Sequence, residues 1–173
     1  PAQTIEQLPL EWFVSDGVVL DFDGREDGDA IGATDVESAL AAAGHEIKPL
    51  DIVLVRTGCD RWIDTAEYMA HGPGVTAGAT HWLYERGVRV MGIDAWGWDR
   101  PLWMQAQEAI ESGEQGIFWE AHQADLAYSQ IERLVNLGSL PPTGFTVSCL
   151  PLPLVGGSAA PARVVAMLDQ ERD

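Results

Sequence analysis

Short apolar runs alternate with helix-like segments along the first two thirds of the chain. Three of these runs are continuous, of strand length and rich in branched residues, which predicts buried strands at 17–22 (GVVLDF), 51–57 (DIVLVRT) and 88–94 (VRVMGID). Helices are predicted between and after them, at 34–44, 76–87 and 102–113. Three further strand candidates follow the last helix, at 128–137, 144–152 and 162–168.

Capping signals support the predicted helices. Thr34 and Glu37 have the spacing of a capping box, and Thr76 stands where an N-cap is expected. Gly44 and Gly113 suit the C-terminal ends of two of the helices. Strands that alternate with helices and then give way to a strand-rich tail predict a single α/β domain, with a central mixed sheet flanked by helices.

Composition narrows the classes of partner. The chain has 173 residues, enough for one domain with a sizeable core, and a net charge of -17 with Lys48 as its one lysine. Such a surface repels nucleic acid and anionic membranes, so neither is expected as a partner. Cys59 and Cys149 are too few for a disulfide framework or a thiolate metal site. With no leader-like segment at the N-terminus, we expect a cytoplasmic location.

The segment WEAHQADLAYSQIERLVNL (119–137) carries the most chemistry. It places His122 near Glu120, Asp125 and Glu132. A histidine with carboxylates is a ligand set that suits Zn²⁺ or Mn²⁺. His122 and Glu132 are too far apart to share one helix face, so they would have to meet through tertiary folding. From these residues alone, a buried histidine that is hydrogen-bonded to a carboxylate is the favoured interpretation.

The other histidines carry weaker signals. His45 follows Gly44 at a predicted helix end, where a cation suits the helix dipole, and is interpreted as structural. His71 lies in a loop (HGPG) that could border a site or simply be solvated. His81 lies inside a predicted helix beside Trp82, which favours packing or a surface position.

A second candidate region is GIDAWGWD. Asp94 ends a predicted buried strand, where α/β folds usually place their ligand sites, and Trp96 and Trp98 follow it. Aromatic rings beside a carboxylate at a strand end suit a pocket for a flat, partly apolar substrate. The alternative is that the tryptophans pack a subunit interface.

Several segments, taken in order, resemble one family. They are IEQLPLEWFVSDGVVLDF, LDIVLVRTG, GPGVTAGATHWLYERGVRVMGIDAWGWDRP, FWEAHQADLAYSQIERLVNLGSLPPTGFTVSCLPLPLVGGSA and ARVVAML. They are similar to the cyclase family of metal-dependent hydrolases, which includes bacterial kynurenine formamidase (arylformamidase), isatin hydrolase and a dienelactone hydrolase. The resemblance implies a partly barrel-like central sheet of the swivelling β/β/α type.

The resemblance also implies chemistry. Family members open amides, cyclic amides or lactones with Zn²⁺ or Mn²⁺, and hold the metal mainly through an HxGTHxD stretch that does not occur in this sequence. We therefore expect residues 1–173 to be a cyclase-like domain truncated at its N-terminus, with the main metal ligands in a separate segment. His122 and Glu132 match the family's downstream histidine and glutamate, which implies a catalytic or metal-binding role for both. Asp94, Trp96 and Trp98 are the expected substrate-binding residues.

The predicted function is thus a metal-dependent hydrolase of the arylformamidase type, acting on a small-molecule substrate. Two alternatives remain: the chain is the C-terminal part of a split or clipped enzyme that is inactive alone, or it is a non-catalytic relative that binds a small molecule. The resemblance implies a homo-oligomer, at least a dimer, together with a possible separate N-terminal fragment. The seven tryptophans suit a buried interface.

Overall fold

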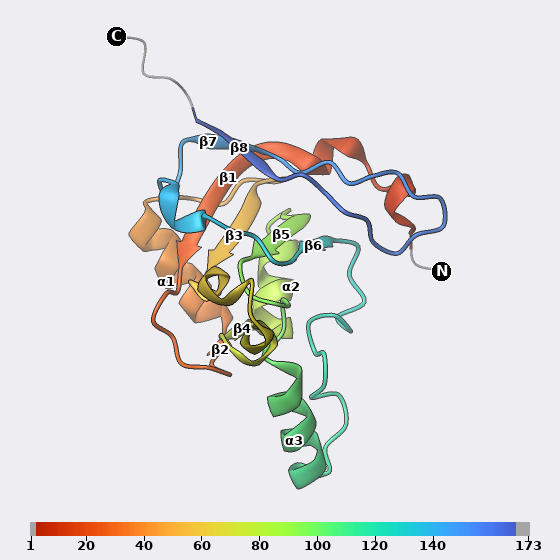
Figure 1. The fold of residues 1–173 in the computed structure, drawn as a ribbon. Helices are drawn as coiled ribbons and strands as arrows, with labels where there is room; N and C mark the ends of the chain where they lie inside the picture. The colour runs from red at the N-terminus through yellow and green to blue at the C-terminus, as the bar shows by residue number, and fades with distance from the viewer. Residues whose placement is uncertain (1–2, 169–173) are drawn as a thin grey trace.

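The computed structural model describes residues 3–168, which form one α/β domain around a mixed six-stranded sheet (Figure 1). Across the sheet the strands run β6 (Ser129–Ile131), β5 (Val90–Ile93), β3 (Ile52–Arg56), β1 (Val14–Asp21), β7 (Phe145–Ser148) and β8 (Val165–Leu168). The first four strands are parallel, and β7 and β8 extend the sheet in antiparallel pairs. The predicted α/β class and mixed sheet are confirmed.

Helices α1 (Ala33–Ala43) and α2 (Ala77–Glu85) pack on one face of this sheet, whereas α3 (Leu102–Ser112) projects away from it (Figure 1). A small parallel sheet pairs β2 (Ala30–Ile31) with β4 (Gly74–Val75). Short 3-10 helices complete the elements: η1 (Ile5–Gln7), η2 (Leu10–Phe13), η3 (Cys59–Trp62), η4 (Ala66–Ala70) and η5 (Leu137–Ser139). No helix in residues 3–168 has both the length and the apolar character needed to span a bilayer.

Both faces of the central strands are buried, which explains their continuous apolar runs. Val53 and Val55 of β3 belong to the core between the sheet and helices α1 and α2. Ile52 and Leu54 point to the opposite face, into a second core that includes Phe145 of β7. This alternation follows from the two-residue period of a strand.

Three of the predicted helix ends are confirmed and one is wrong. Gly44 ends α1 in the left-handed conformation, with φ 64°. Thr76 caps α2, since its hydroxyl accepts a hydrogen bond from the Ala79 N–H at 3.1 Å. Gly113 ends α3 in the left-handed conformation, with φ 69°. The capping box predicted at Thr34 and Glu37 is wrong, because α1 begins one residue earlier; Gly32 is the N-cap, and its N–H donates to Asp35 at 2.9 Å.

The strand predicted at 128–137 is also wrong in its length. Only Ser129–Ile131 form β6, because Arg133 and Asn136 both adopt φ 63°, a left-handed conformation that cannot continue a strand. The turn at Arg133 follows directly after Glu132 and redirects the chain there.

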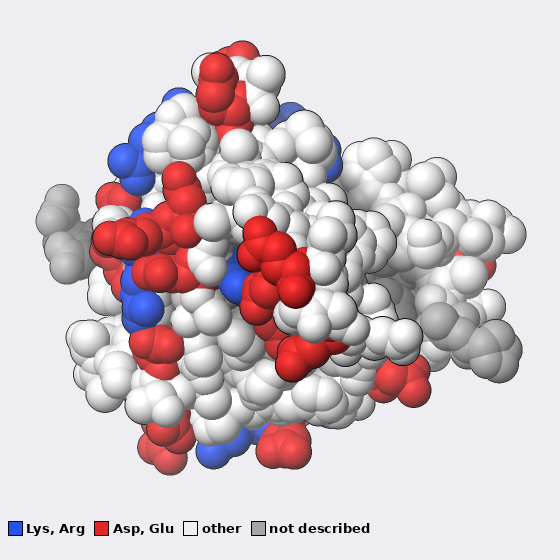
Figure 2. Space-filling model, turned by 90° about the horizontal axis from the view of Figure 1, so that it is seen from below, with Lys and Arg blue, Asp and Glu red and all other residues white. Residues whose placement is uncertain are grey.

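Acidic side chains dominate the surface, as the net charge requires. Figure 2 shows several groups of Asp and Glu on one face, with Lys and Arg close to some of them. Arg56 pairs with Asp21 and Asp23, each at 2.7 Å, and Arg61 also pairs with Asp23 at 2.7 Å. These exposed pairs relieve repulsion between the carboxylates that follow β1.

Gly74 of β4 fixes the position of the loop that follows β5. Its Cα approaches the backbone of Asp99 and Arg100 so closely that a Cβ at position 74 would clash with main-chain atoms. The next residue, Val75, donates its N–H to the Trp98 carbonyl at 2.8 Å. A side chain cannot be accommodated here without moving the backbone of residues 98–100.

We expect Gly74→Ala to lower the free energy of unfolding by about 1–3 kcal/mol. The added methyl group would clash with main-chain atoms, and a change of rotamer cannot relieve that clash. Gly78→Ala is the matched control: Gly78 is exposed in α2, and a Cβ there would meet Thr76 Oγ1 at 3.8 Å, an ordinary contact distance, so alanine should be neutral or stabilising. Urea unfolding of both variants measures the difference. Equal stability of the two variants would contradict the close approach at Gly74.

Candidate active site

The Asp99 carboxylate organises the candidate site. Asp99 lies in the loop after β5 and is 6% exposed. One oxygen accepts the Ala121 N–H at 2.9 Å, and the other accepts the His122 N–H at 3.3 Å and contacts His122 Nδ1 at 2.5 Å. A single carboxylate therefore holds both the backbone and the ring of His122.

Glu132 approaches the other nitrogen of the same ring. Its Oε1 lies 3.5 Å from His122 Nε2 and accepts the Trp98 N–H at 3.3 Å. The structure thus brings His122 and Glu132 together through tertiary folding, and adds Asp99 as a third member. We call these three residues the His122 cluster.

The two carboxylates change the acidity of the imidazole. Asp99 first, and then Glu132, raise the pKa of His122 to about 9, against a smaller opposing effect of burial. The protonated ring is therefore the main form at neutral pH. Its side chain is 32% exposed, so a proton on it can be exchanged with a bound molecule.

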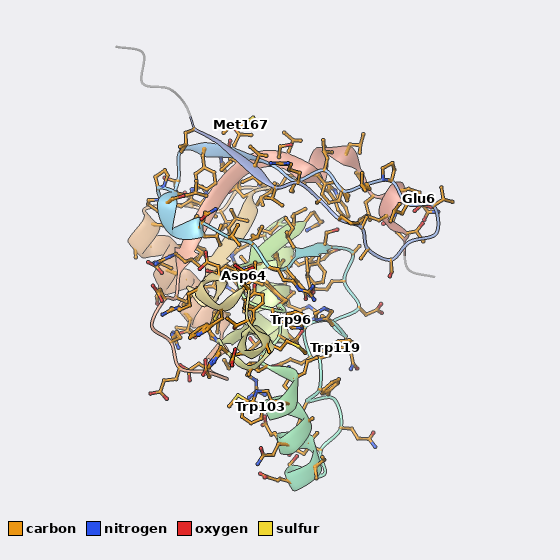
Figure 3. All side chains as sticks on the ribbon, viewed as in Figure 1. Glu6, Asp64, Trp96, Trp103, Trp119 and Met167 are labelled. Atoms are coloured by element: carbon orange, nitrogen blue, oxygen red, sulfur yellow. The ribbon has the colours of Figure 1, made fainter. Side chains whose placement is uncertain are left out.

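A cleft with about 410 Å³ of empty space, part of it open to solvent, lies beside the His122 cluster. Its polar walls come from His71, Asp99, Arg100 and His122. The rings of Trp96 and Trp119 provide much of the rest, and Trp119 stacks on His122 with ring centroids 5.1 Å apart. Figure 3 shows both tryptophans at the point where α3 meets the body of the domain.

The three expected substrate-binding residues have different surroundings. Trp96 lines the cleft, where the guanidinium of Arg133 lies 3.6 Å from its ring centroid. Trp98 is fully buried, and its indole N–H donates to the Thr80 hydroxyl at 3.0 Å. The structure therefore places Trp96 in the cleft and Trp98 in the core.

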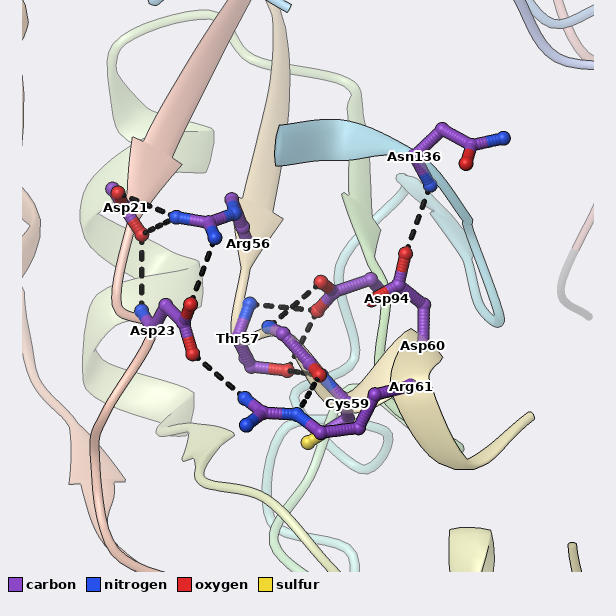
Figure 4. Close-up of polar contacts among 10 residues, drawn as sticks. Asp21, Asp23, Arg56, Thr57, Cys59, Asp60, Arg61, Asp94 and Asn136 are labelled. Carbon is purple, nitrogen blue, oxygen red and sulfur yellow. Dashed lines mark hydrogen bonds and ion pairs between the residues drawn. The ribbon is translucent and has the colours of Figure 1, made fainter. Parts of the chain in front are cut away.

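Asp94 is 1% exposed and lies outside the cleft lining. It accepts the N–H and O–H of Thr57 at 2.7 and 2.6 Å and the Gly58 N–H at 2.9 Å (Figure 4). Burial raises the pKa of Asp94, while these hydrogen bonds act in the opposite direction. The contacts of Asp94 tie the end of β5 to the end of β3, beneath the site.

Asp99 was not predicted from the sequence, although a signal was present. It follows the same strand end that drew attention to Asp94, and it lies beyond two tryptophans in the loop. Among the remaining histidines, His45 pairs with Asp51 at 2.7 Å and His81 is exposed on α2, in agreement with structural and surface positions. His71 borders the cleft.

The donor set tests whether these residues suit a metal ion. Catalytic zinc sites use three protein ligands, usually with histidine among them. No group of three or more His, Cys, Asp or Glu side chains within residues 3–168 is arranged to hold a metal. In the His122 cluster Nδ1 is already bonded to Asp99, which leaves Nε2 and Glu132. The described residues alone therefore do not fit a catalytic metal ion.

A histidine held between two carboxylates in a cleft is suited to proton transfer. The family comparison is specific: residues 1–100 match the family model Cyclase, described as "Putative cyclase". Because this match covers more than half of the 173 residues, the chain belongs to the cyclase family. No curated protein matches the sequence significantly.

Solved structures support the same assignment. Isatin hydrolase A from Ralstonia solanacearum has 25% identity and a TM-score of 0.79, over 98% of this chain and 65% of its own. A potential metal-dependent hydrolase with cyclase activity has 26% identity and a TM-score of 0.70, over 97% and 72%. An isatin hydrolase bound to the product analogue thioisatinate shares the fold at 20% identity, with a TM-score of 0.81 over 96% and 64%. The chain spans 64–66% of the length of the isatin hydrolases.

We expect His122 of the metal-free protein to titrate near pH 9, and the variant Asp99→Asn to bring its pKa down toward the ordinary value. Since the folded-state pKa is raised, the stabilisation from this pair is complete below about pH 6.5. It is lost as the pH rises through about 9. NMR titration of the imidazole measures the pKa directly. Glu111→Gln, which removes one charge from exposed α3, is the control and should leave the titration unchanged; an unshifted His122 in Asp99→Asn would refute the pairing.

Proposed function

We propose that this chain forms part of a hydrolase that opens an amide, a cyclic amide or a lactone, with His122 as the proton-transfer residue. The observation that carries the proposal is the His122 ring itself, held at Nδ1 by Asp99 at 2.5 Å and faced at Nε2 by Glu132 at 3.5 Å, in the wall of a cleft. Family membership and the solved structures of hydrolases support the same class. Arylformamidase-like specificity is a narrower prediction within it.

The arrangement suits general acid catalysis. Because the two carboxylates stabilise the imidazolium, His122 carries a proton at neutral pH that Nε2 can release toward the cleft. Asp99 keeps the ring in one orientation, which a proton donor needs in order to reach the leaving group. Trp119 packs on one face of the ring and restricts its rotation.

In the proposed step, a water oxygen bonds to the carbonyl carbon of the substrate. The carbon–nitrogen or carbon–oxygen bond of the leaving group then breaks, and its electron pair stays with the leaving atom. That atom takes the proton from His122 Nε2, and a proton shed by the attacking water restores the imidazolium. The products are a carboxylic acid, which ionises, and an amine or alcohol; when the substrate is a ring, both groups belong to one product molecule.

A Zn²⁺ or Mn²⁺ ion is part of the proposal, because the similar structures include a potential metal-dependent hydrolase. The part of the chain that the structure describes offers too few free ligands, so the remaining ligands would have to come from polypeptide outside residues 3–168. The homo-oligomer and the separate N-terminal fragment also stay predictions, which rest on the family resemblance.

In the complete enzyme, His122→Gln should reduce kcat by roughly 10²–10⁴, the usual contribution of a positioned general acid or base. The melting temperature should also fall somewhat, because the buried Asp99 carboxylate loses the imidazolium that it faces, so kcat is compared at a temperature where both proteins are folded. His81→Gln is the matched control on exposed α2 and should behave as the wild type in both measurements. Unchanged turnover in His122→Gln would remove His122 from the mechanism.

The isolated 173-residue chain should bind Zn²⁺ or Mn²⁺ far more weakly than a site with three protein ligands, because the His122 cluster offers only Nε2 and one carboxylate. Isothermal titration calorimetry with each metal measures this. Tight binding with one ion per chain would show that the described residues hold the metal by themselves, and would contradict the requirement for further ligands.

A further inference from the structure

A second histidine–carboxylate pair borders the same cleft. His71 Nδ1 lies 2.7 Å from Asp27 Oδ2, and the other oxygen of Asp27 accepts the Gly72 N–H at 2.7 Å. His71 and His122 both belong to the cleft wall, although they come from segments on opposite sides of α2 and α3 in the chain. The His122 mechanism leaves this pair without a role.

The His71 ring is fixed on more than one side. Trp62 stacks on its face, with centroids 4.1 Å apart and planes inclined by 18°. The guanidinium of Arg61 in turn lies over the Trp62 ring, 4.8 Å from its centroid. Asp27 holds Nδ1 from the ring edge. Within residues 3–168, His71 Nε2 makes no hydrogen bond, which leaves this atom as the polar group that the ring can offer to the cleft.

The pairing with Asp27 determines which nitrogen carries the proton. Partial burial of Asp27 opposes ionisation, but the Gly72 N–H and His71 outweigh it, so that the pKa of Asp27 is lowered. An ionised carboxylate only accepts hydrogen bonds, so Nδ1 must be the donor. When the ring is neutral, Nε2 then has a free lone pair and acts as an acceptor, whereas in the imidazolium both nitrogens donate; binding is therefore compared at a pH where NMR shows the neutral ring.

We propose that His71 is a specificity-determining residue of the cleft, whose Nε2 accepts the N–H of a secondary or cyclic amide. The inference rests on the proposed function and names its substrate class: amides that keep an N–H, in preference to esters and lactones of the same shape. An analogue with oxygen in place of the N–H would leave His71 Nε2 without a hydrogen-bond donor, and this costs binding free energy. Such an analogue is therefore rejected. His71 thereby selects the ligand, while His122 moves the proton.

Binding of two matched probes tests the proposal without turnover. Oxindole has a ring N–H, and 2-coumaranone has an oxygen at the same position. We expect the metal-free full chain to bind oxindole about tenfold more tightly than 2-coumaranone, because one neutral hydrogen bond contributes about that much to binding. Quenching of tryptophan fluorescence measures both affinities. His71→Phe keeps a flat ring against Trp62 but removes the acceptor, and should bind both probes equally. His81→Phe, at the exposed surface of α2, should keep the tenfold preference.

The outcomes separate the two proposals. If the wild type binds both probes equally, or His71→Phe keeps the preference, the role of His71 is overturned and the hydrolase proposal stands. If the wild type binds neither probe, the role of His71 is overturned, and the hydrolase proposal is judged separately by the turnover of His122→Gln. A ¹⁵N NMR measurement of the His71 tautomer is independent of any ligand: a proton on Nδ1 is expected in the neutral ring, and a proton on Nε2 alone would overturn the inference.

Discussion

The candidate site depends on one buried carboxylate that has more than one partner. Asp99 receives two consecutive backbone N–H groups, from Ala121 and His122, as well as the His122 ring. These contacts fasten a segment of irregular chain to the loop after β5, and that loop is itself held by the close approach of Gly74. Removing charge at position 99 would therefore affect the course of the backbone and the acidity of the imidazole together. The His122 ring and its support are one unit.

Elsewhere in the site, the residues that support the structure are different from those that line the cleft. Asp94 and Trp98 come from the same stretch as Trp96, yet they are buried and bonded to Thr57, Gly58 and Thr80. They connect strand ends and helix α2 beneath the cleft, and only Trp96 lines the cleft itself. The pairing of two histidines with two aspartates gives the cleft two rings, His71 and His122, that both contact an aspartate through Nδ1. They differ at Nε2, which faces Glu132 in His122 and has no hydrogen bond within the described residues in His71.

The sequence predicted the fold well because the signals were local. The apolar runs that became β1, β3 and β5, and the glycine that ends α3, depend on nearest neighbours in the chain. His122 and Glu132 were found through the family resemblance, and the structure brings them within 3.5 Å, although their roles stay predictions. Asp99 and the His71–Asp27 pair could not be derived in this way. Their partners lie far away in sequence, so the pairs exist only after folding. The burial of Trp98 is likewise decided by tertiary packing, which the pattern of apolar residues along the chain does not encode.

The dispersal of the site along the chain has a consequence for biosynthesis. Asp27, His71, Asp99, His122 and Glu132 are brought together by parallel strands whose pairing joins distant segments, and such contacts form slowly compared with local ones. During translation the early half of the sheet can begin to collapse, but the cleft has no His122 cluster until the polypeptide beyond Glu132 has left the ribosome. A nascent chain that is still shorter than this therefore lacks the histidine and the glutamate that complete the site.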